Sequence, residues 1–362
     1  MTAIVEEGQE VAMTTMTRRA ALRGGAAFAG ALVLGAGRDA SRRSGPGRPS
    51  LVVFWLNGGP AGLFNSAGSF LRSGAFGVTT NNVRDLGNGL IVDAQSLGAL
   101  PAVALGHMAS VNYRHEIRRP HERARAAVLE SSGRSQLLRL ASAMPEAAVR
   151  CAVVNDLGLP VGVASDPPAE AGIRLERILD LGALEARIGA RESDGVRAAY
   201  GVRAEASGVR DQSATFAAVE MLVRAGAGVV FAQPAYTGRA DRQFDTHEDD
   251  SGVQARAIMA PITPALSAFL ERVLALPDRN VVTLLVGEFS RTVPASDHEP
   301  GGTATVIGRY VRTGTAGPQS ADGAPPPDAP ETASLWSYAA AALRLETTAW
   351  GPNPHPELIA AG

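Results

Sequence analysis

Two short polar segments of the sequence each combine an aspartate with a histidine. The first, FDTHEDD, covers residues 244–250 and contains Asp245 and His247. The second, DHEPGG, begins with the neighbours Asp297 and His298. Carboxylate and imidazole together are a common ligand set for a divalent metal ion. The sequence therefore predicts a metal site built from these four side chains, and an ordinary solvated acidic loop is the alternative for the first segment.

A glutamate and an arginine lie between these two segments, in GEFSRT at residues 287–292. Glu288 can ligate a metal or orient a ligating histidine, because carboxylates commonly fix the tautomer of such an imidazole. Arg291 can hold an anionic oxygen through two parallel hydrogen bonds. A metal beside them would polarise a phosphoryl or sulfuryl oxygen and activate a nucleophile. The alternative is a surface ion pair between the two side chains.

The other histidines carry weaker signals. His115 and His121 lie in RHEIRRPHE, residues 114–122, just before an expected helix. A helix cap and a surface residue are the favoured interpretations, and His121 is the better of the two candidates for a site role. His107 and His355 are expected to be structural or exposed.

Buried strands are expected to position the paired Asp and His residues. Residues 281–286, VVTLLV, have the length and β-branched content of a buried strand and run directly into the polar tail that ends in DHEPGG. Residues 228–233, GVVFAQ, form a similar run shortly before FDTHEDD. Ligands of an open parallel sheet bind beyond the carboxyl ends of its strands. Both segments are therefore expected at the same edge of one sheet.

The rest of the chain alternates strand and helix patterns. The other expected strands are 51–57, 109–113, 147–155 and 303–307. The expected helices are 97–107, 122–129, 135–144, 213–224, 250–276 and 331–343. This alternation predicts an α/β fold with a central, mostly parallel sheet and helices on both faces. Residues 156–211 are expected as a peripheral insertion of one or two helices, and residues 63–95 and 313–329 as loops.

Composition excludes several functional classes. The net charge of −2 argues against binding nucleic acid or acidic membranes through bulk electrostatics. All 34 basic residues are arginine, so a Schiff-base lysine, a P-loop lysine and a Ser-Lys dyad are excluded. Cys151 is the one cysteine, which rules out an intrachain disulfide. The turn at 58–62 lacks the G-x-G-x-x-G pattern of a dinucleotide site.

The first 50 residues have the pattern of an export signal. Arg18 and Arg19 precede a short, weakly hydrophobic and glycine-rich run at residues 24–37. Paired arginines in this position are typical of a twin-arginine signal, and a chance pair before an Ala-rich helix is the alternative. The run is too short for a stable membrane span. We expect residues 1–37 to engage the twin-arginine translocase, residues 38–50 to be a disordered linker, and the protein to be periplasmic or secreted.

The order of the motifs along the chain is also informative. A twin-arginine leader, a Gly-Gly turn after the first strand, FDTHEDD, GEFSRT and DHEPGG follow one another. In this order they resemble the exported family catalogued as domain of unknown function 1501, which is similar in fold to the alkaline phosphatase and sulfatase superfamily. The resemblance spans residues 51–347 and leaves 348–362 as a C-terminal tail. It implies an alkaline-phosphatase-like α/β domain.

The resemblance also implies roles for the matching residues. Asp245 with His247, and Asp297 with His298, match pairs that bind one or two divalent metal ions in the superfamily; zinc, calcium, magnesium and manganese all stay open. Glu288 matches the first residue of the family's Glu-Phe-x-Arg pattern, and the arginine of GEFSRT matches its last. The implied activity is hydrolysis of a phosphate or sulfate ester, on an anionic small molecule or a glycan ester.

The sequence departs from this family at the turn after the first strand. Ala61 stands near the position where relatives carry an acid, and Asn57 offers an amide oxygen without charge. Ser66 and Ser69 are both candidate nucleophiles. Glu299 replaces the glycine that usually follows Asp-His. The alternatives to a hydrolase are therefore a non-catalytic exported binding or assembly protein that keeps the fold, and an anion-binding protein that uses the arginine and the Gly-Gly turn without metal.

Overall fold

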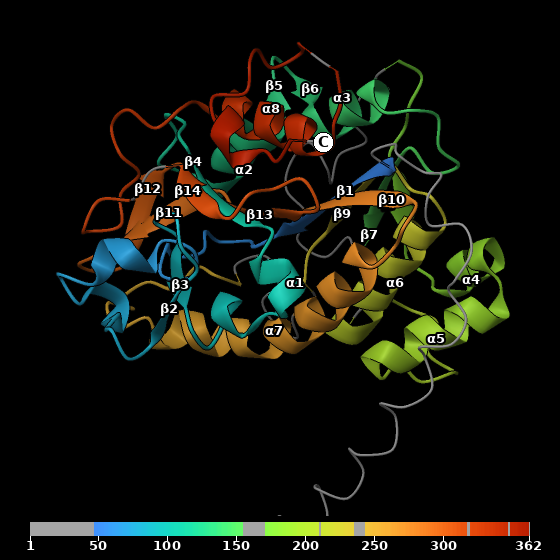
Figure 1. Cartoon of the computed structure of the whole chain (residues 1–362), viewed down its shortest axis with the longest axis horizontal. Coiled ribbons are helices and arrows are strands. Elements are labelled where there is room, and N and C mark those ends of the chain that lie inside the picture. The colour runs from blue at the N-terminus through green and yellow to red at the C-terminus, as the bar shows by residue number, and fades with distance from the viewer. Residues whose placement is uncertain are drawn as a thin grey trace, which may run out of the picture. The chain divides into compact units, whose positions relative to one another are not determined.

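The computed structural model describes residues 47–154, 171–209, 211–234, 243–316, 319–346 and 348–361. The predicted export signal and most of the predicted linker lie outside these residues. An eight-stranded sheet organises the described part, in the order β14-β4-β13-β10-β1-β9-β7-β8 (Figure 1). The strands are β1 Arg48–Trp55, β4 Met108–Tyr113, β7 Cys151–Val154, β8 Glu176–Ile178, β9 Val229–Ala232, β10 Arg279–Val286, β13 Gly302–Gly308 and β14 Gly314–Ala316.

The sheet is mostly parallel. β1 lies between β10 and β9 and pairs with both in parallel, and β7 continues the parallel set toward β8. β13 runs opposite to its two neighbours, β10 and β4, and β14 pairs in parallel with β4. Helices cover both faces, so the predicted α/β architecture is confirmed.

The two faces of the sheet bury separate hydrophobic clusters. Side chains alternate along a strand, so Val52 and Phe54 of β1 enter one cluster while Val53 and Trp55 enter the other. Figure 1 shows the helices of the first face below the sheet and those of the second above it. The first face carries α1 Ala102–Leu105, α6 Gln212–Arg224 and α7 Val253–Leu274; the second carries α2 His121–Leu129, α3 Gln136–Ala143 and α8 Thr332–Ala342.

Aromatic packing fixes the first face. The ring of Phe54 lies 4.7 Å from that of Phe216 on α6 and 5.3 Å from that of Phe269 on α7, centroid to centroid. Burial of one such side chain stabilises the fold by about 1.5–3 kcal/mol. The helices that flank the sheet are thus locked to its central strand, whose carboxyl end leads into the candidate site.

Smaller elements decorate this core. Two-stranded pairs form from β2 Val83–Asp85 with β3 Ile91–Asp93, β5 Glu130–Ser131 with β6 Arg134–Ser135, and β11 Phe289–Thr292 with β12 Asp297–Pro300. Helices α4 Gly182–Ile188 and α5 Ala190–Tyr200 pack on α6. The short 3-10 helices are η1 Ala67–Phe70, η2 Ala75–Gly77, η3 Leu97–Ala99 and η5 Pro356–Leu358. The β11–β12 hairpin carries GEFSRT and DHEPGG, which the sequence indicated only as a polar tail.

The structure differs from the sequence expectations at several edges. Residues 48–50, expected in the linker, begin β1, and the expected insertion at 156–211 contributes β8 to the main sheet. Residues 313–329, expected as a loop, contain β14. In the expected C-terminal tail, Trp350 is buried and donates a hydrogen bond to Gln136. The two added strands have three residues each, which is too short to leave a periodic pattern.

Helix α7 is long and apolar enough to cross a membrane by length and composition alone. Core helices pass the same test, and α7 packs against α6 and β10 and buries Met259, Leu266 and Phe269 in the hydrophobic core. It contains Pro261 and Pro264 and continues through both.

Candidate metal centre

The candidate site lies beyond the carboxyl ends of β1 and β10. β1 leads into a turn in which Gly58 and Gly59 have φ values of +102° and +88°. A Cβ atom on Gly58 would lie 2.4 Å from the backbone nitrogen of Asp245, so only glycine fits there. The backbone nitrogen of Phe244 donates a 2.7 Å hydrogen bond to the carbonyl oxygen of Asn57. This close approach anchors the FDTHEDD segment against the end of the first strand.

The β11–β12 hairpin delivers the second half of the site. In its antiparallel register Arg291 pairs with His298, and Thr292 pairs with Asp297. Residues opposite one another point to the same face, and their neighbours point to the other. His298 and Arg291 therefore face Asp245, whereas the Asp297 carboxylate turns toward the surface.

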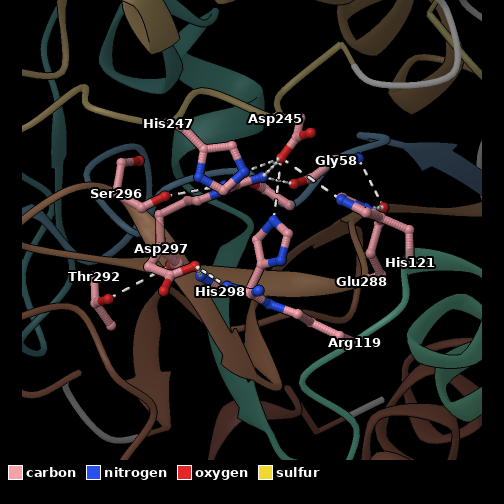
Figure 2. Close-up of polar contacts among 12 residues, drawn as sticks. Gly58, Arg119, His121, Asp245, His247, Glu288, Thr292, Ser296, Asp297 and His298 are labelled. Carbon is pink, nitrogen blue, oxygen red and sulfur yellow. Dashed lines mark hydrogen bonds and ion pairs between the residues drawn. The ribbon is translucent and has the colours of Figure 1, made fainter.

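Three histidines converge on one carboxylate oxygen (Figure 2). The Nε2 atoms of His247 and His298 lie 3.0 and 3.1 Å from Asp245 Oδ1, and that of His121 lies 3.6 Å from it. Ligand atoms of His121, Asp245 and His298 all lie within 4.8 Å of one another, so one ion could contact all three. His247 belongs to the outer side of this group, with a side chain that is 47% exposed.

His121 is oriented by a buried carboxylate. It is the first residue of α2, which follows Pro120. Its Nδ1 atom lies 2.9 Å from Glu288 Oε1. Because a carboxylate only accepts hydrogen bonds, Nδ1 carries the proton and Nε2 presents a lone pair toward Asp245. A carboxylate that fixes the tautomer in this way is typical of histidines that bind metal through the other nitrogen.

Glu288 is held in place by further donors. The backbone nitrogen of Gly58 donates to Glu288 Oε1 at 2.9 Å, and Arg125 Nε does so at 3.3 Å. Burial acts to raise the pKa of Glu288, but the hydrogen bond from His121 and the charge of Arg125 outweigh it and lower the pKa below its usual value. Glu288 is therefore an ionised carboxylate at the side of the cluster.

Arg291 contacts the protein rather than open space. It is fully buried, and its Nε and NH1 groups donate to the carbonyl oxygens of Gly59 and Ser296, both at 3.0 Å. Its NH2 group donates to Gly58 and, at 2.7 Å, to Asp245 Oδ1. The geometry thus places the guanidinium behind Asp245, where it orients the carboxylate and braces the Gly-Gly turn.

The electrostatics keep Asp245 ionised and His298 neutral. Burial acts to raise the pKa of Asp245, but hydrogen bonds from His298 and Arg291 hold the pKa far below its ordinary value. Burial lowers the pKa of His298, against the opposing effect of Asp245. A carboxylate anion and a neutral imidazole are the protonation states that metal binding requires.

Two orphaned atoms support the fit to a cation. Glu288 Oε2 and His298 Nδ1 are buried and have no hydrogen-bond partner among the described residues. The His298 ring stacks on Phe289 at 4.3 Å with an interplanar angle of 7°, which fixes its orientation. Two imidazoles and a carboxylate in one small volume match the ligand set of a catalytic zinc-type centre. The residues present therefore fit a divalent ion.

Only some of the four metal ligands predicted from the sequence meet in the structure. Asp245 and His298 meet in the cluster, and His247 contacts it from the rim. The Asp297 side chain is 51% exposed and lies 3.4 Å from Arg119, so it is not part of the cluster. The metal-binding roles of His247 and Asp297 stay predictions.

The turn after β1 does not bring a nucleophile to the cluster. Ala61 is buried in the apolar core, and Asn57 Oδ1 accepts a hydrogen bond from Trp55. Ser66 Oγ is buried without a hydrogen-bond partner among the described residues, and Ser69 is half-buried. Over the same described residues, no serine or threonine hydroxyl is hydrogen-bonded to Asp245 or to the three histidines.

His121 is the cluster residue that the sequence reasoning left outside its metal set. The signal available in the sequence was its position at the start of a helix that follows a strand. In a parallel sheet, this position lies at the carboxyl edge. The nearby His115 is buried beside the cluster, with Nε2 2.7 Å from the carbonyl oxygen of Glu288. Burial lowers the pKa of His115, which supports a neutral, structural imidazole.

No protein-family model and no curated protein matches the chain. The solved structures that resemble it over most of its length include the following three. Ps i-CgsB in complex with k-i-k-neocarrahexaose shows 9% identity and a TM-score of 0.40, over 85% of this chain and 76% of that one. Phosphonate monoester hydrolase SpPMH from Silicibacter pomeroyi shows 12% identity and a TM-score of 0.37, over 86% of this chain and 76% of that one. The lipoteichoic acid synthase LtaP from Listeria monocytogenes shows 11% identity and a TM-score of 0.39, over 84% of this chain and 75% of that one. At these scores the likeness adds no assignment of residues or reaction.

Proposed function

We propose that this protein is a metal-dependent hydrolase of phosphate or sulfate esters. One observation carries the proposal: His121, Asp245 and His298 come from three distant parts of the chain and place ligand atoms within 4.8 Å of one another. Convergence of this kind costs conformational freedom. A divalent cation bound between the three ligand atoms would contact all of them.

Each residue of the site has a distinct role in this proposal. His121, Asp245 and His298 hold the cation, which when bound supplies the Lewis acidity that polarises the ester and acidifies water. Glu288 keeps the His121 Nε2 lone pair directed at the cation site. Arg291 orients Asp245 and keeps it ionised, in place of the anion-clamping role that the sequence suggested for it.

Two exposed arginines suit an anionic ester. Arg118 and Arg119 lie on the segment that leads into His121, with side chains 67% and 74% exposed. Their partners, Glu299 and Asp297, lie on β12 beside His298. An incoming phosphate or sulfate group can compete for such exposed guanidinium groups. The choice of phosphate or sulfate esters as substrates rests on the sequence resemblance, and these arginines are compatible with it.

Water is the nucleophile in this proposal. No described hydroxyl is hydrogen-bonded to the cluster, and the His247 imidazole lies at its rim, 3.0 Å from Asp245, where a water bound at the cluster could exchange a proton with it. The absence of an acid at Ala61 limits the proposal to a single metal ion. Export through the twin-arginine translocase, with a periplasmic or secreted location, belongs to the same proposal and is supported by the pattern of residues 18–37.

A non-catalytic exported binding or assembly protein is the second candidate. The same lack of a hydroxyl beside the cluster favours it, since the metal would then be structural. A turnover measurement distinguishes the two functions, because only the hydrolase would convert a substrate.

Turnover of an aryl phosphate and an aryl sulfate by the metal-loaded protein tests the proposal. We expect His298→Ala to remain folded and to lose turnover by at least about 100-fold, because one of the three metal ligands is missing. His107→Ala is the control, since His107 directly precedes the amino end of β4, whereas the cluster lies at the carboxyl edge of the sheet, and it contacts the carbonyl oxygen of Val311. Equal turnover in wild type and His298→Ala, or none in either after metal loading, would sink the hydrolase assignment.

A further inference from the structure

A cavity lies beside the metal centre and shares none of its ligands. Its volume is about 520 Å³. The walls come from residues 114–116, the end of α2, the β5–β6 hairpin, the start of α3 and residues 327–333. His115 separates it from the metal centre, because one side of this residue lines the cavity while Nε2 contacts the carbonyl oxygen of Glu288. Cavities of this volume commonly hold a small organic ligand.

A buried amide reaches into this cavity without a partner. Gln136 is only 2% exposed, and its Oε1 atom accepts a 2.6 Å hydrogen bond from Trp350 Nε1. An indole nitrogen can only donate, so this contact fixes which end of the amide is oxygen. The Nε2 group then points elsewhere, and it donates to no group among the described residues. This nitrogen is not fully enclosed by protein atoms. Because Gln136 lines the cavity, its Nε2 group faces that cavity.

The charge on the cavity walls is negative. Glu116, Glu130 and Glu331 line the cavity, against one guanidinium from Arg114. Arg114 is loosely paired with Glu116, at 3.9 Å. Glu130 and Glu331 form no ion pair in the part of the chain that the structure describes. Neutral His115 does not offset them, since burial lowers its pKa.

These walls specify the chemistry of a ligand. Two unpaired carboxylates recognise a cation, and charge-assisted hydrogen bonds to an ammonium are among the stronger polar contacts. The Gln136 amide donates to an oxygen, and the Ser131 hydroxyl can donate or accept. We propose that this cavity binds a small organic ammonium that also carries hydroxyl groups, of the size and type of an amino sugar. The proposal does not depend on the metal centre or on the reaction assigned to it.

Calorimetric titration of the full chain tests this site, with glucosamine as the probe, at low salt and below the pKa of its amine. Glucose is the matched neutral compound, because a hydroxyl replaces the ammonium. The double variant Glu130→Gln with Glu331→Gln removes both unpaired charges without changing side-chain size. The Glu331 side chain does not cap α8, so the variant is expected to fold. Glu357→Gln, outside the cavity, is the control substitution.

We expect saturable glucosamine binding that is at least about fivefold tighter than glucose binding, and about tenfold weaker in the double variant, because hydrogen bonds to charged groups are the stronger ones. The Glu357→Gln control is expected to match wild type. Chelator-treated and metal-loaded protein are expected to bind glucosamine equally, which separates this site from the metal centre. Equal binding of the two sugars, unchanged affinity in the double variant, or no saturable binding at all would overturn the proposal.

Discussion

At the scale of single residues, the chemistry depends on one carboxylate oxygen. Asp245 Oδ1 is approached by three imidazole Nε2 atoms and by the guanidinium of Arg291. Arg291 is enclosed by backbone carbonyls and fixes the carboxylate from behind. The imidazoles occupy the other side. Arg291 therefore orients Asp245 from one side, and the side that faces the imidazoles is where a cation would bind.

The role of Glu288 as the residue that orients His121 gives a direct prediction. We expect Glu288→Gln to lower zinc affinity by about 10- to 100-fold, the usual effect of removing a carboxylate that supports a metal-binding histidine. Competition with a chromogenic chelator measures this affinity. The control is Glu299→Gln, which changes a carboxylate that pairs with Arg118 at the rim. Equal zinc affinity in Glu288→Gln and wild type would contradict the assigned role.

At the scale of elements, a strand-end turn and a hairpin hold the cluster. The turn after β1 needs glycine because the backbone of residues 244–245 passes directly against it. The β11–β12 hairpin chooses which of two neighbouring residues, Asp297 or His298, faces inward. The site therefore depends on backbone geometry as much as on its ligands.

Gly58→Ala tests the contribution of the turn. Its φ of +102° and the 2.4 Å approach of Asp245 predict a loss of roughly 1–3 kcal/mol from backbone strain, with a further loss from the clash. Zinc affinity is expected to fall too, since Asp245 must shift. Gly74→Ala is the matched control, at φ +69° with nothing within 4 Å of the added Cβ. Urea denaturation measures both variants, and equal losses would show that the close approach has no effect.

A buried ionic cluster joins the helices on the first face of the sheet. Glu220 of α6 accepts hydrogen bonds from Tyr200 of α5, Arg224 of α6 and Arg272 of α7. Burial acts to raise the pKa of Glu220, but these hydrogen bonds dominate and lower it below its model-compound value of 4.5. The folded state thus binds a proton at this residue less readily than the unfolded state does.

This cluster predicts a pH dependence of stability. A carboxyl whose pKa is depressed by folding contributes its full stability above the unfolded pKa and loses it as pH falls through the folded pKa. The free energy of unfolding should therefore decline below about pH 4.5. In Glu220→Gln we expect a lower stability at pH 7 and a shallower decline in acid. Urea denaturation between pH 3 and pH 7 measures both, and an unchanged slope in the variant would contradict the assignment.

At the scale of the whole molecule, the architecture follows from the sequence more fully than the site does. β1 and β10 have eight residues each and contain long apolar runs, LVVFW and VVTLLV, so their positions were predictable. β8 and β14 are too short to show a pattern. Asp245 and His298 were predictable because each follows a buried strand at the carboxyl edge. The inward position of His121 was not, since it depends on where α2 begins in space.

The hairpin explains the remaining difference. The sequence shows Asp297 beside His298 and cannot tell which of them turns inward, because that depends on the register with β11. In the same way, Arg291 is a plausible anion ligand in sequence, and only the fold shows the carbonyl oxygens that surround it. Contacts between distant segments decide both outcomes.

The metal content of the purified full chain tests the central claim most directly. Elemental mass spectrometry after dialysis without chelator should find about one equivalent of a divalent metal in wild type and much less in His298→Ala, because the residues present fit one cation. Adding zinc, calcium, magnesium or manganese to stripped wild type should raise Tm for the metal that binds. No bound metal, together with no Tm shift for any of the four, would contradict the account.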